Sequence, residues 1–364
     1  MKRRAFLGRG AAGLIAGTAL AKPALAQGRM EWRLVTAWPK QAQDLMGGVE
    51  RLALRIQQMS DSRLSVKVLA AGELVPEGQV FDAVSQGMAE LGHCAAHDHL
   101  SKTAGSAFFA AVPFGMTGAE TASWINHGDA QGLWDELYAP LNVKPFLAGD
   151  IGPRPLGWFR RELKTAADLK DLKVRIPGWG GRVLSVLGAE LVNTAPNEIA
   201  AQLESGGLDG ASWSSLHGDT ALGLLGAGRY CYLPGVLAPG TTLELLVNKQ
   251  RFDALAPDLK AIVKAAAEAT HADIESEQAI RSAEAFDALR SQRGPRVLKA
   301  TNELLAALGA ATNAYLRQER DKADTKAKRL FGSYFEARGR LVPFQRSFAD
   351  AYGAVRDLKV KFPS

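Results

Sequence analysis

The sequence predicts an α/β protein with two α/β lobes and a long helical section at its C-terminal end. Up to Val247, short apolar strands alternate with amphipathic helices, which is the pattern of parallel sheets flanked by helices. From Pro257 onward the pattern is almost entirely helical, with Ala-rich stretches at 261–291, 302–328 and 340–358. The chain has 364 residues, which exceeds the size at which one hydrophobic core usually keeps growing.

Residues 1–26 have the composition of an export signal. A charged start precedes an apolar run at 11–21 and a small-residue cleavage site. The pair Arg3-Arg4, followed by Phe-Leu, resembles the signal of the Tat export pathway. We expect cleavage before Gln27 and a protein located in the periplasm. A membrane anchor is the alternative, although the apolar run is short for a membrane span.

Removal of this segment changes the charge of the chain. The segment holds five cations and no acids, so the formal net charge of +6 falls to about +1. No basic stripe with interleaved aromatics remains, which argues against nucleic-acid binding. No later apolar run has the length of a membrane helix. The two cysteines, Cys94 and Cys231, fit no haem, zinc-ribbon or CxxC spacing, and whether they pair is open.

The elements of the first lobe follow from hydrophobic periodicity. Alternation predicts a strand over Trp32–Thr36, and apolar residues at helical spacing predict a helix over Leu45–Met59. A strand at Leu64–Leu69, a helix from Val75 to Gly87 and a strand at Glu90–Cys94 complete a β-α-β-α-β series.

The second lobe continues the alternation. The predicted helices are Ala166–Leu172, Gly181–Leu187 and Asn197–Leu203, and the predicted strands are Lys173–Ile176, Glu190–Val192, Leu208–Trp213 and, further on, Thr242–Val247. Gly- and Pro-rich crossovers near 150–153 and 239–243 suit hinge strands, although ordinary turns would look the same. We therefore assign lobe I to 27–150 plus about 241–290, lobe II to 151–240, and the C-terminal helices to about 291–364.

Arg175 is the residue that says most about function. It lies near the end of the short apolar strand Lys173–Ile176, which Pro177-Gly178 terminates at once. Burying a guanidinium is costly unless an acid or an anion meets it. Arg175 could be a structural residue paired with a nearby acid. It could also be an anion clamp, because the planar guanidinium binds a carboxylate with two hydrogen bonds. We expect the clamp, with no full protein counterion beside it.

Much of the chain follows the pattern of one family, in the segments Glu31–Trp38, DAVSQGMAELGH (82–93), AVPFGMT (111–117), LWDELYAP (133–140), GWFRREL (157–163), DLKDLKVRIPG (168–178), LESGGLDGASW (203–213) and LELLVNKQRFDAL (243–255). In these segments it resembles the solute-binding proteins of TRAP transporters, the DctP-type receptors, and most closely those that bind 2-oxo acids. The resemblance implies a periplasmic-binding-protein-like fold whose two lobes close on a small organic acid. It also implies no cofactor, Arg175 as the carboxylate-binding arginine, and delivery to a membrane permease of two subunits driven by an ion gradient.

Other pocket candidates have structural alternatives. The resemblance implies that Trp213 forms an aromatic wall of the site, but it could be a core residue, as could Trp38 at the end of the first strand. Phe114, in a loop, could cover the ligand or pack in the core. Asn248 could hydrogen-bond the ligand or cap the helix that follows it.

Some residues depart from the 2-oxo acid receptors. In those receptors a cation lies beside the ligand, held in part by a glutamine and an acid; the matching positions here are Arg154 and Ser212. Hard cations need oxygen ligands, so a cation near Ser212, Trp213 and Arg154 is doubtful. Arg154 could instead join Arg175 in clamping a carboxylate without a cation or in holding two acidic groups of one ligand, or it could be a surface or hinge residue paired with Asp150. In this case the ligand could be a dicarboxylate or an aromatic acid.

The segment from His93 to His99 raises two further hypotheses. Its His, Cys and Asp side chains are metal-ligand types, but their spacing fits no standard metal motif. Pocket tyrosines of the 2-oxo acid receptors are replaced here by His97 and Asp98, which could line the pocket. Protonation of His97 could then make ligand affinity depend on pH.

Three classes of function are compatible with these features: a receptor that feeds a permease, a sensor or adaptor module, and a periplasmic enzyme. No nucleophile–base, HExxH, GxSxG or phosphate-loop motif favours an enzyme. The amphipathic stretch 340–358 leaves the oligomeric state open, because related 2-oxo acid receptors can exchange a terminal helix to form dimers. A monomer is the alternative.

Overall fold

The first of two sheets combines strands from residues 30–150 with one strand from residues 242–248. The computed structural model describes residues 29–291 and 294–356, so the expected signal segment lies outside the described residues. The first sheet has the order β2-β1-β3-β10-β4, formed by Leu64–Leu69, Met30–Thr36, Leu91–Cys94, Thr242–Asn248 and Val143–Asp150. Strand β1 runs parallel to β2 and β3, as the β-α-β-α-β pattern predicts. Strand β10 runs antiparallel to both β3 and β4.

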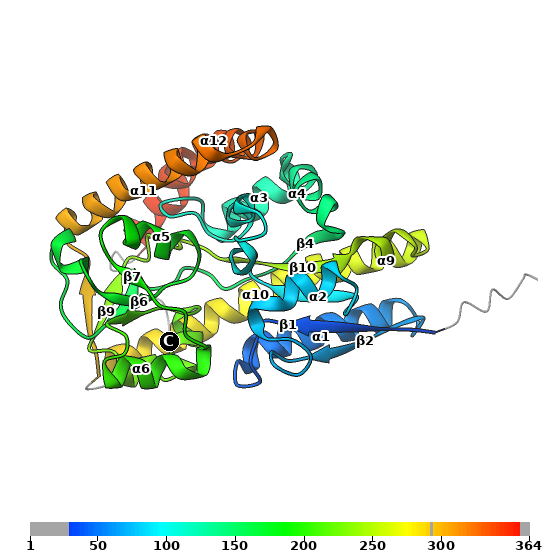
Figure 1. Cartoon of the computed structure of the whole chain (residues 1–364), viewed down its shortest axis with the longest axis horizontal. Helices are drawn as coiled ribbons and strands as arrows, with labels where there is room; N and C mark the ends of the chain where they lie inside the picture. Colours follow the sequence, from blue (N-terminus) through cyan, green and yellow to red (C-terminus); the bar gives the residue numbers. More distant parts are fainter. Residues whose placement is uncertain (1–28, 292–293, 357–364) are drawn as a thin grey trace, which may run out of the picture.

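The second sheet forms the other lobe, at the left in Figure 1. Its order is β11-β9-β5-β8-β6-β7, formed by Arg296–Lys299, Tyr230–Leu233, Gly157–Phe159, Gly210–Ala211, Lys173–Arg175 and Glu190–Leu191. Strand β11 corrects the expectation that the chain is helical throughout this region, because it pairs in parallel with β9. The two sheets together confirm the α/β class, while the domain boundaries stay a prediction.

Helices surround both sheets. The α-helices are α1 Gln43–Met59, α2 Val80–Ser85, α3 Gly118–His127, α4 Ala130–Tyr138, α5 Gly178–Val186, α6 Ile199–Ser205, α7 Leu216–Ala221, α8 Leu224–Ala227, α9 Lys249–Asp253, α10 Pro257–Ser291, α11 Asn302–Lys322, α12 Thr325–Gln345 and α13 Ala351–Val355. Short 3₁₀ turns lie at Glu77–Gln79 (η1), Ala96–His99 (η2) and Ala166–Leu169 (η5). The helix expected over Ala166–Leu172 is thus one 3₁₀ turn, capped at its first end by Asp168, which accepts from the backbone N–H of Thr165.

The helix α1 shows how the periodic pattern becomes a packed element. Its apolar face, with Leu45, Val49, Leu52 and Ile56, is buried against the first sheet. On its outer side, Arg51 donates to Asp273 and Glu277 of α10 at 2.6 and 2.5 Å. These contacts fix α1 to α10.

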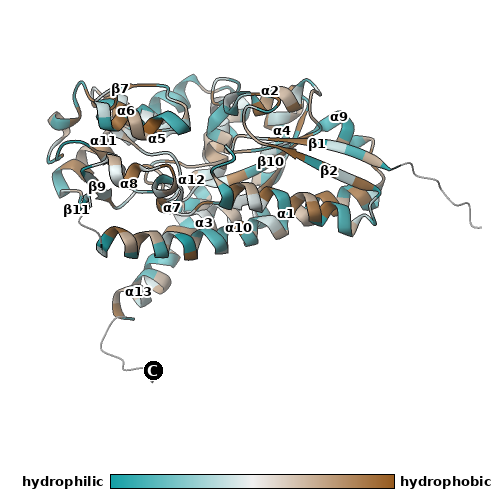
Figure 2. Ribbon diagram, turned by 90° about the horizontal axis from the view of Figure 1, so that it is seen from below, coloured by the Kyte–Doolittle hydropathy of each residue, from teal (hydrophilic) through white to brown (hydrophobic). Residues whose placement is uncertain are grey.

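The helix α10 extends along both lobes. It has 35 residues, which corresponds to about 52 Å of helix. It contacts β4 and α1 in the first lobe and α7 in the second, and Figure 2 shows it beneath both lobes. Among the described residues, no helix is apolar enough over a sufficient length to cross a membrane.

The C-terminal helices close the molecule. Phe331 and Tyr334 of α12 are buried in a cluster of aromatic side chains that includes Phe108, with ring centroids 4.7 and 4.9 Å away. Beyond α12 the chain projects from the body (Figure 2), and Phe348 and Tyr352 are 64% and 65% exposed.

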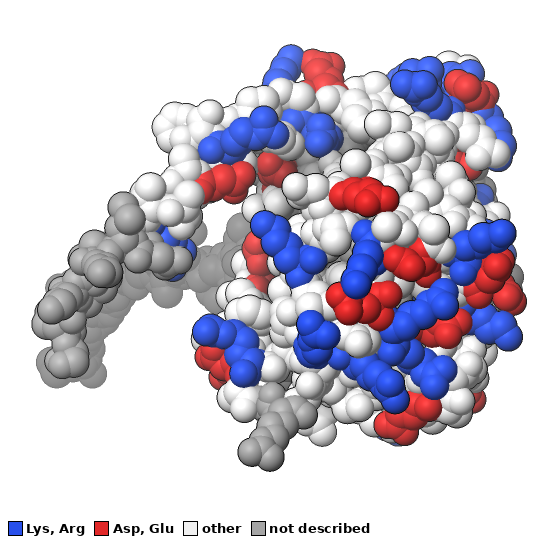
Figure 3. Space-filling view, turned by 90° about the vertical axis from the view of Figure 1, so that its left-hand side faces the viewer, with Lys and Arg blue, Asp and Glu red and all other residues white. Residues whose placement is uncertain are grey.

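The charged side chains on the molecular surface are of both signs. Figure 3 shows Lys and Arg interspersed with Asp and Glu across one face of the molecule. This distribution agrees with the sequence-based argument against a nucleic-acid-binding stripe.

Candidate functional site

A small cavity lies between the two lobes. It measures about 30 Å³, and its walls come from residues at or just beyond the carboxyl ends of strands in both sheets, among them Trp38, His97, Ile151, Arg175 and Trp213. Ligands of α/β proteins commonly bind at this end of the strands. This volume is well below the roughly 300–1,000 Å³ of typical ligand pockets.

Arg175, the last residue of β6, lines this cavity. Its side chain is 13% exposed, and its Nε and Nη1 donate to the carbonyl groups of Thr194 and Ser212 at 3.4 and 3.5 Å. Glu77 Oε1 lies 3.8 Å from Nη2, which is beyond hydrogen-bonding distance. An acid is therefore closer to Arg175 than the sequence led us to expect, yet all of these contacts are long. Burial lowers the pKa of Arg175, whereas the negative charges of Glu77, Asp98 and Asp219 raise it, so nearby acids offset part of its charge at a distance.

Two acids line the cavity opposite Arg175. Burial raises the pKa of Glu77, in η1, to about 7 and the pKa of Asp98, in η2, to about 6, although the positive charge of Arg175 opposes both shifts. The two carboxyl groups therefore gain protons near neutral pH. As a result, the cavity becomes more positive as pH falls.

His97 and Trp38 also line the cavity. Burial lowers the pKa of His97 well below its usual value, and the neighbouring Arg154 and Arg175 lower it further. Both effects favour the neutral imidazole, and a dependence of ligand affinity on the protonation of His97 stays a prediction. Trp38 donates its indole N–H to Nδ1 of His93 at 2.8 Å, which fixes the ring at the cavity wall.

Gly178 brings the second lobe close to His97. Its φ of 69° is unfavourable for other residues, and an added Cβ would lie 3.1 Å from the Cβ of His97. A side chain here would therefore strain the backbone and crowd His97.

Arg154 is buried behind the cavity, with 4% exposure. Its Nη1 donates to the carbonyl of Trp213 at 3.2 Å. The alternative of a surface arginine paired with Asp150 is wrong, because Arg154 is inside the protein and Asp150 accepts from the backbone N–H of Gly152 at 2.6 Å. Burial lowers the pKa of Arg154 to about 10, a value at which it is still charged near pH 7.

These residues do not fit a hard cation beside Ser212, Trp213 and Arg154. The carbonyl oxygen of Trp213 already accepts from the guanidinium of Arg154, which also places a permanent positive charge there. Ser212 offers one hydroxyl oxygen, whereas a hard cation requires several oxygen ligands.

Asp219 holds the segment that carries Trp213. Its carboxylate accepts from the backbone N–H groups of Trp213 and Ser214 at 2.9 and 2.8 Å and from the indole N–H of Trp158 at 2.9 Å. Burial raises the pKa of Asp219 to about 6. Trp213 is 8% exposed and lines the cavity, as the pocket interpretation of this residue requires.

Phe114 and Asn248 lie away from the cavity. Asn248 is at the opposite end of β10, where its amide oxygen accepts from the N–H of Arg251 and its amide N–H donates to the carbonyl of Val84. The capping interpretation is therefore the correct one. Phe114 packs under the C-terminal helices, and its carbonyl accepts from Arg338 at 2.9 Å.

Sequence reasoning missed several residues of the site. The sequence pattern indicates Glu77 only as the start of a helix, and it gives no signal for Asp219 or Thr241. Thr241 offers a free polar group at the cavity wall. In the described part of the chain, its hydroxyl group and those of Thr194 and Ser212 are buried without a hydrogen-bond partner. No local pattern marks these residues, because their positions depend on the contact between the lobes.

The chain has extensive similarity to known proteins. The model of the family described as bacterial extracellular solute-binding protein, family 7, matches residues 35–322. A curated relative from Nostoc, named a monocarboxylate 2-oxoacid-binding periplasmic protein, is 38% identical over 237 residues, which span 65% of each chain. The match thus covers less than two thirds of that relative's length.

Solved structures show the same fold. A TRAP transporter solute-binding protein from Bordetella bronchiseptica, with copurified calcium and picolinate, is 28% identical, with a TM-score of 0.86 over 90% of this chain and 97% of that one. One from Pseudoalteromonas atlantica, with bound sodium and pyruvate, is also 28% identical, with a TM-score of 0.86 over 89% and 98% of the two chains. Both agree with the two-lobed architecture.

Proposed function

Because the chain belongs to family 7 of the bacterial extracellular solute-binding proteins, we propose that it is a periplasmic receptor for a small organic acid. It delivers this acid to the membrane subunits of a TRAP-type secondary transporter. The export signal expected at residues 1–26, of the Tat type, would take the protein to the periplasm. The same family membership supports a binding role rather than an enzymatic one.

The observation that carries this proposal is the state of Arg175. Its guanidinium lines a cavity between the lobes with only long contacts to protein groups. Buried polar groups without good partners are costly, and a ligand carboxylate would supply two short, charge-assisted hydrogen bonds. The ligand therefore stabilises the closed form by supplying the short hydrogen bonds that the Arg175 guanidinium does not make to protein groups.

The ligand is a small monocarboxylate, with a 2-oxo acid as the favoured class. The Nostoc relative, which is named for 2-oxo acids, supports this class. Calcium or sodium accompanies the ligand in the two solved structures described above. Here Arg154 contributes the positive charge, so the acid binds without a separate cation. A dicarboxylate that uses both Arg154 and Arg175 is the alternative within the same class.

Native mass spectrometry of freshly purified protein tests the proposal. We expect the mass of the protein to increase by the mass of one organic acid. We do not expect a metal ion to bind and dissociate together with that acid. Calorimetry with pyruvate, with and without Ca²⁺ and Na⁺, then tests the ligand class. Failure of every small carboxylate to bind or to raise the melting temperature contradicts the receptor proposal.

The projecting C-terminal end suggests a homodimer. Phe344, Phe348 and Tyr352 are 56%, 64% and 65% exposed along one continuous helical segment. Large exposed apolar surfaces usually mark interfaces. The helix exchange implied by the family resemblance would cover these side chains with a second copy of the chain.

A further inference from the structure

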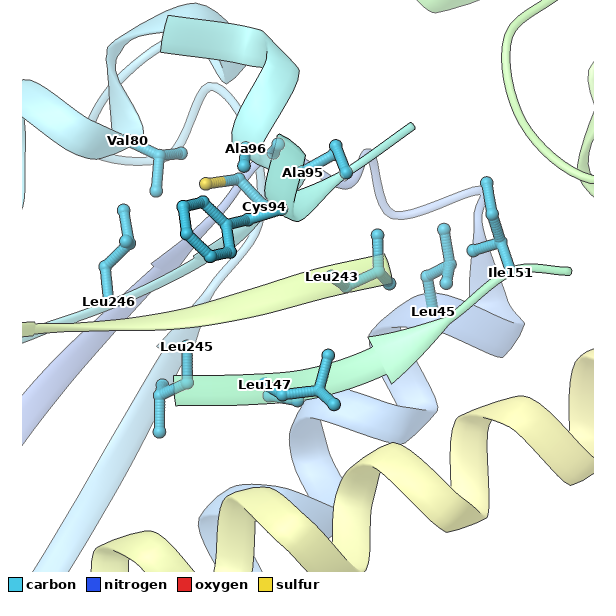
Figure 4. Packing of buried hydrophobic residues seen from close by; sticks show 14 of the residues in the cluster. Leu45, Val80, Cys94, Ala95, Ala96, Leu147, Ile151, Leu243, Leu245 and Leu246 are labelled. Carbon is cyan, nitrogen blue, oxygen red and sulfur yellow. The ribbon is translucent and has the colours of Figure 1, made fainter. Parts of the chain in front are cut away.

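A second cluster of functional side chains lies next to the cavity, and the ligand proposal does not use it. Cys94 ends β3, Glu244 is its direct cross-strand partner on β10, and His99 ends η2. Their exposures are 0%, 0% and 2%. Figure 4 shows Cys94 among apolar side chains that include Val80 and Ala96.

The donor atoms of this cluster converge on one point. One atom from each of the three residues lies within 4.8 Å of the others. Nε2 of His99 is 3.0 Å from Glu244 Oε1, and Sγ of Cys94 is 3.5 Å from the same oxygen. Around a tetrahedral Zn²⁺, with ligand distances of about 2.0–2.3 Å, neighbouring donor atoms are about 3.3–3.8 Å apart. The two separations from Glu244 Oε1 are close to this range, and the third pair, from Cys94 to His99, lies within 4.8 Å.

Tyr138 completes the shell of this cluster. Its hydroxyl oxygen is 2.7 Å from Nε2 of His99 and 3.2 Å from Glu244 Oε2. Nε2 thus has two oxygen atoms within 3.0 Å but at most one proton to donate. The Tyr138 hydroxyl donates to Glu244 Oε2, so Nε2 shares one proton between two oxygen atoms, and a metal ion bound at Nε2 would take the place of that proton.

The charges also balance around a divalent cation. The Glu244 carboxylate is completely buried, and a buried charge needs a compensating one. A thiolate and a carboxylate together carry two negative charges, and a neutral imidazole adds none, so a divalent ion makes the site neutral. Thiolate and imidazole donors select zinc-like ions over calcium or sodium.

We propose that Cys94, His99 and Glu244 form a structural site for Zn²⁺ or a similar transition metal, with Tyr138 or water in the fourth position. The site is separate from the position beside Ser212 and Trp213. It fixes η2, which carries His97 and Asp98 to the cavity wall, to β3 and β10. The metal therefore holds one wall of the ligand cavity in place.

Cobalt is a suitable probe of this site, because Co²⁺ bound by a thiolate gives a charge-transfer band in the near ultraviolet. The full-length protein is unfolded in guanidinium with a chelator and a thiol-free reductant, and then refolded with Co²⁺. We expect one equivalent of Co²⁺ to bind with this band and Zn²⁺ to displace it. We also expect Zn²⁺ to raise the melting temperature.

The second cysteine provides a matched control. Cys231 is a buried free thiol like Cys94, but it lies on β9 in the other lobe. The band should disappear in Cys94→Ser and remain in Cys231→Ser. His99→Gln should weaken metal binding at least 10-fold, and it serves as the second variant if Cys94→Ser does not refold.

Two results overturn the proposal. One is refolded wild-type protein with a native circular dichroism spectrum that shows neither the band nor a shift in melting temperature. This result would mean that the cluster is a hydrogen-bonded network only. The other is a band that persists in Cys94→Ser. Neither result bears on ligand binding at Arg175, which calorimetry measures separately.

Discussion

Replacement of Arg175 by alanine is the sharpest test of the ligand site. In the closed structure this guanidinium is largely shielded from water, and its contacts to protein groups are all between 3.4 and 3.8 Å. Most of its hydrogen-bonding capacity is therefore available to a ligand. Removing it also takes away the positive charge that lies nearest the Glu77 carboxyl group at the cavity wall.

The magnitude follows from the loss of a buried, charge-assisted pair. Truncating one partner of such a pair costs about 2–5 kcal/mol, which corresponds to a loss of affinity from about 30-fold to several thousand-fold. Arg175→Lys keeps the charge but loses the planar fork, so we expect an intermediate loss. Arg182→Ala, at an exposed position on α5 in the same lobe, should leave the affinity unchanged.

Isothermal titration calorimetry with the acid identified by native mass spectrometry measures these differences. Circular dichroism and the unfolding midpoint show whether each variant keeps the fold. If Arg175→Ala is folded and binds within about threefold of the wild type, Arg175 is a structural residue and the clamp interpretation is wrong.

Other predictions follow from the same site and its supports. Ligand affinity should rise several-fold as pH falls from about 8 to 6, because Glu77 and Asp98, with pKa values of about 7 and 6, lose their negative charge; a calorimetric series should show a flatter profile in Glu77→Gln. Arg154→Gln replaces a cation with an amide oxygen, so binding should weaken and then recover in part when Ca²⁺ is added to the calorimeter cell. Asp219→Asn puts an amide against three N–H donors and should lower the free energy of unfolding by about 2–3 kcal/mol, measured by guanidinium denaturation; a loss well below this range means that the Trp213 segment has other support. Removal of residues 346–364 should leave a monomer by light scattering, and a full-length chain that is already monomeric at high concentration contradicts the dimer.

Hydrophobic periodicity predicted the helices and strands that are long enough to repeat an apolar face. The helix over Leu45–Met59 and the strand over Leu64–Leu69 were predicted from their apolar patterns, and both are present in the structure. Strand β4 was missed because it contains Pro145, which argues against a strand inside a sheet. The structure places β4 at the edge of its sheet, where proline is tolerated.

A short strand escaped the sequence for a different reason. Strand β5 has only three residues, which is too short for a period to be recognised, whereas the two-residue β8 lies inside the predicted strand Leu208–Trp213. They exist because neighbours distant in sequence pair with them. For the same reason, the antiparallel direction of β10 could not be inferred from local pattern.

The residues of the candidate site also fall into two groups: those that the sequence could identify and those that depend on contacts between the lobes. Arg175 was recognisable because a cation at the end of a buried strand is unusual wherever it occurs. Glu77 was not, because an acid after proline at the start of a helix is common, and only the closed arrangement of the lobes brings it to 3.8 Å from Arg175. Asn248 fitted two roles equally well on sequence grounds, and its hydrogen bonds to Arg251 and Val84 decide for the cap.

The uninterrupted helix α10 has a consequence for how this receptor opens. Beyond its first residue it contains neither proline nor glycine, so it bends only at the expense of its own backbone hydrogen bonds. Because both lobes contact this one helix, its stiffness limits how far they can move apart. A protein that explores few open states loses little conformational entropy when its ligand arrives. More of the interaction energy between acid and guanidinium is then available as affinity.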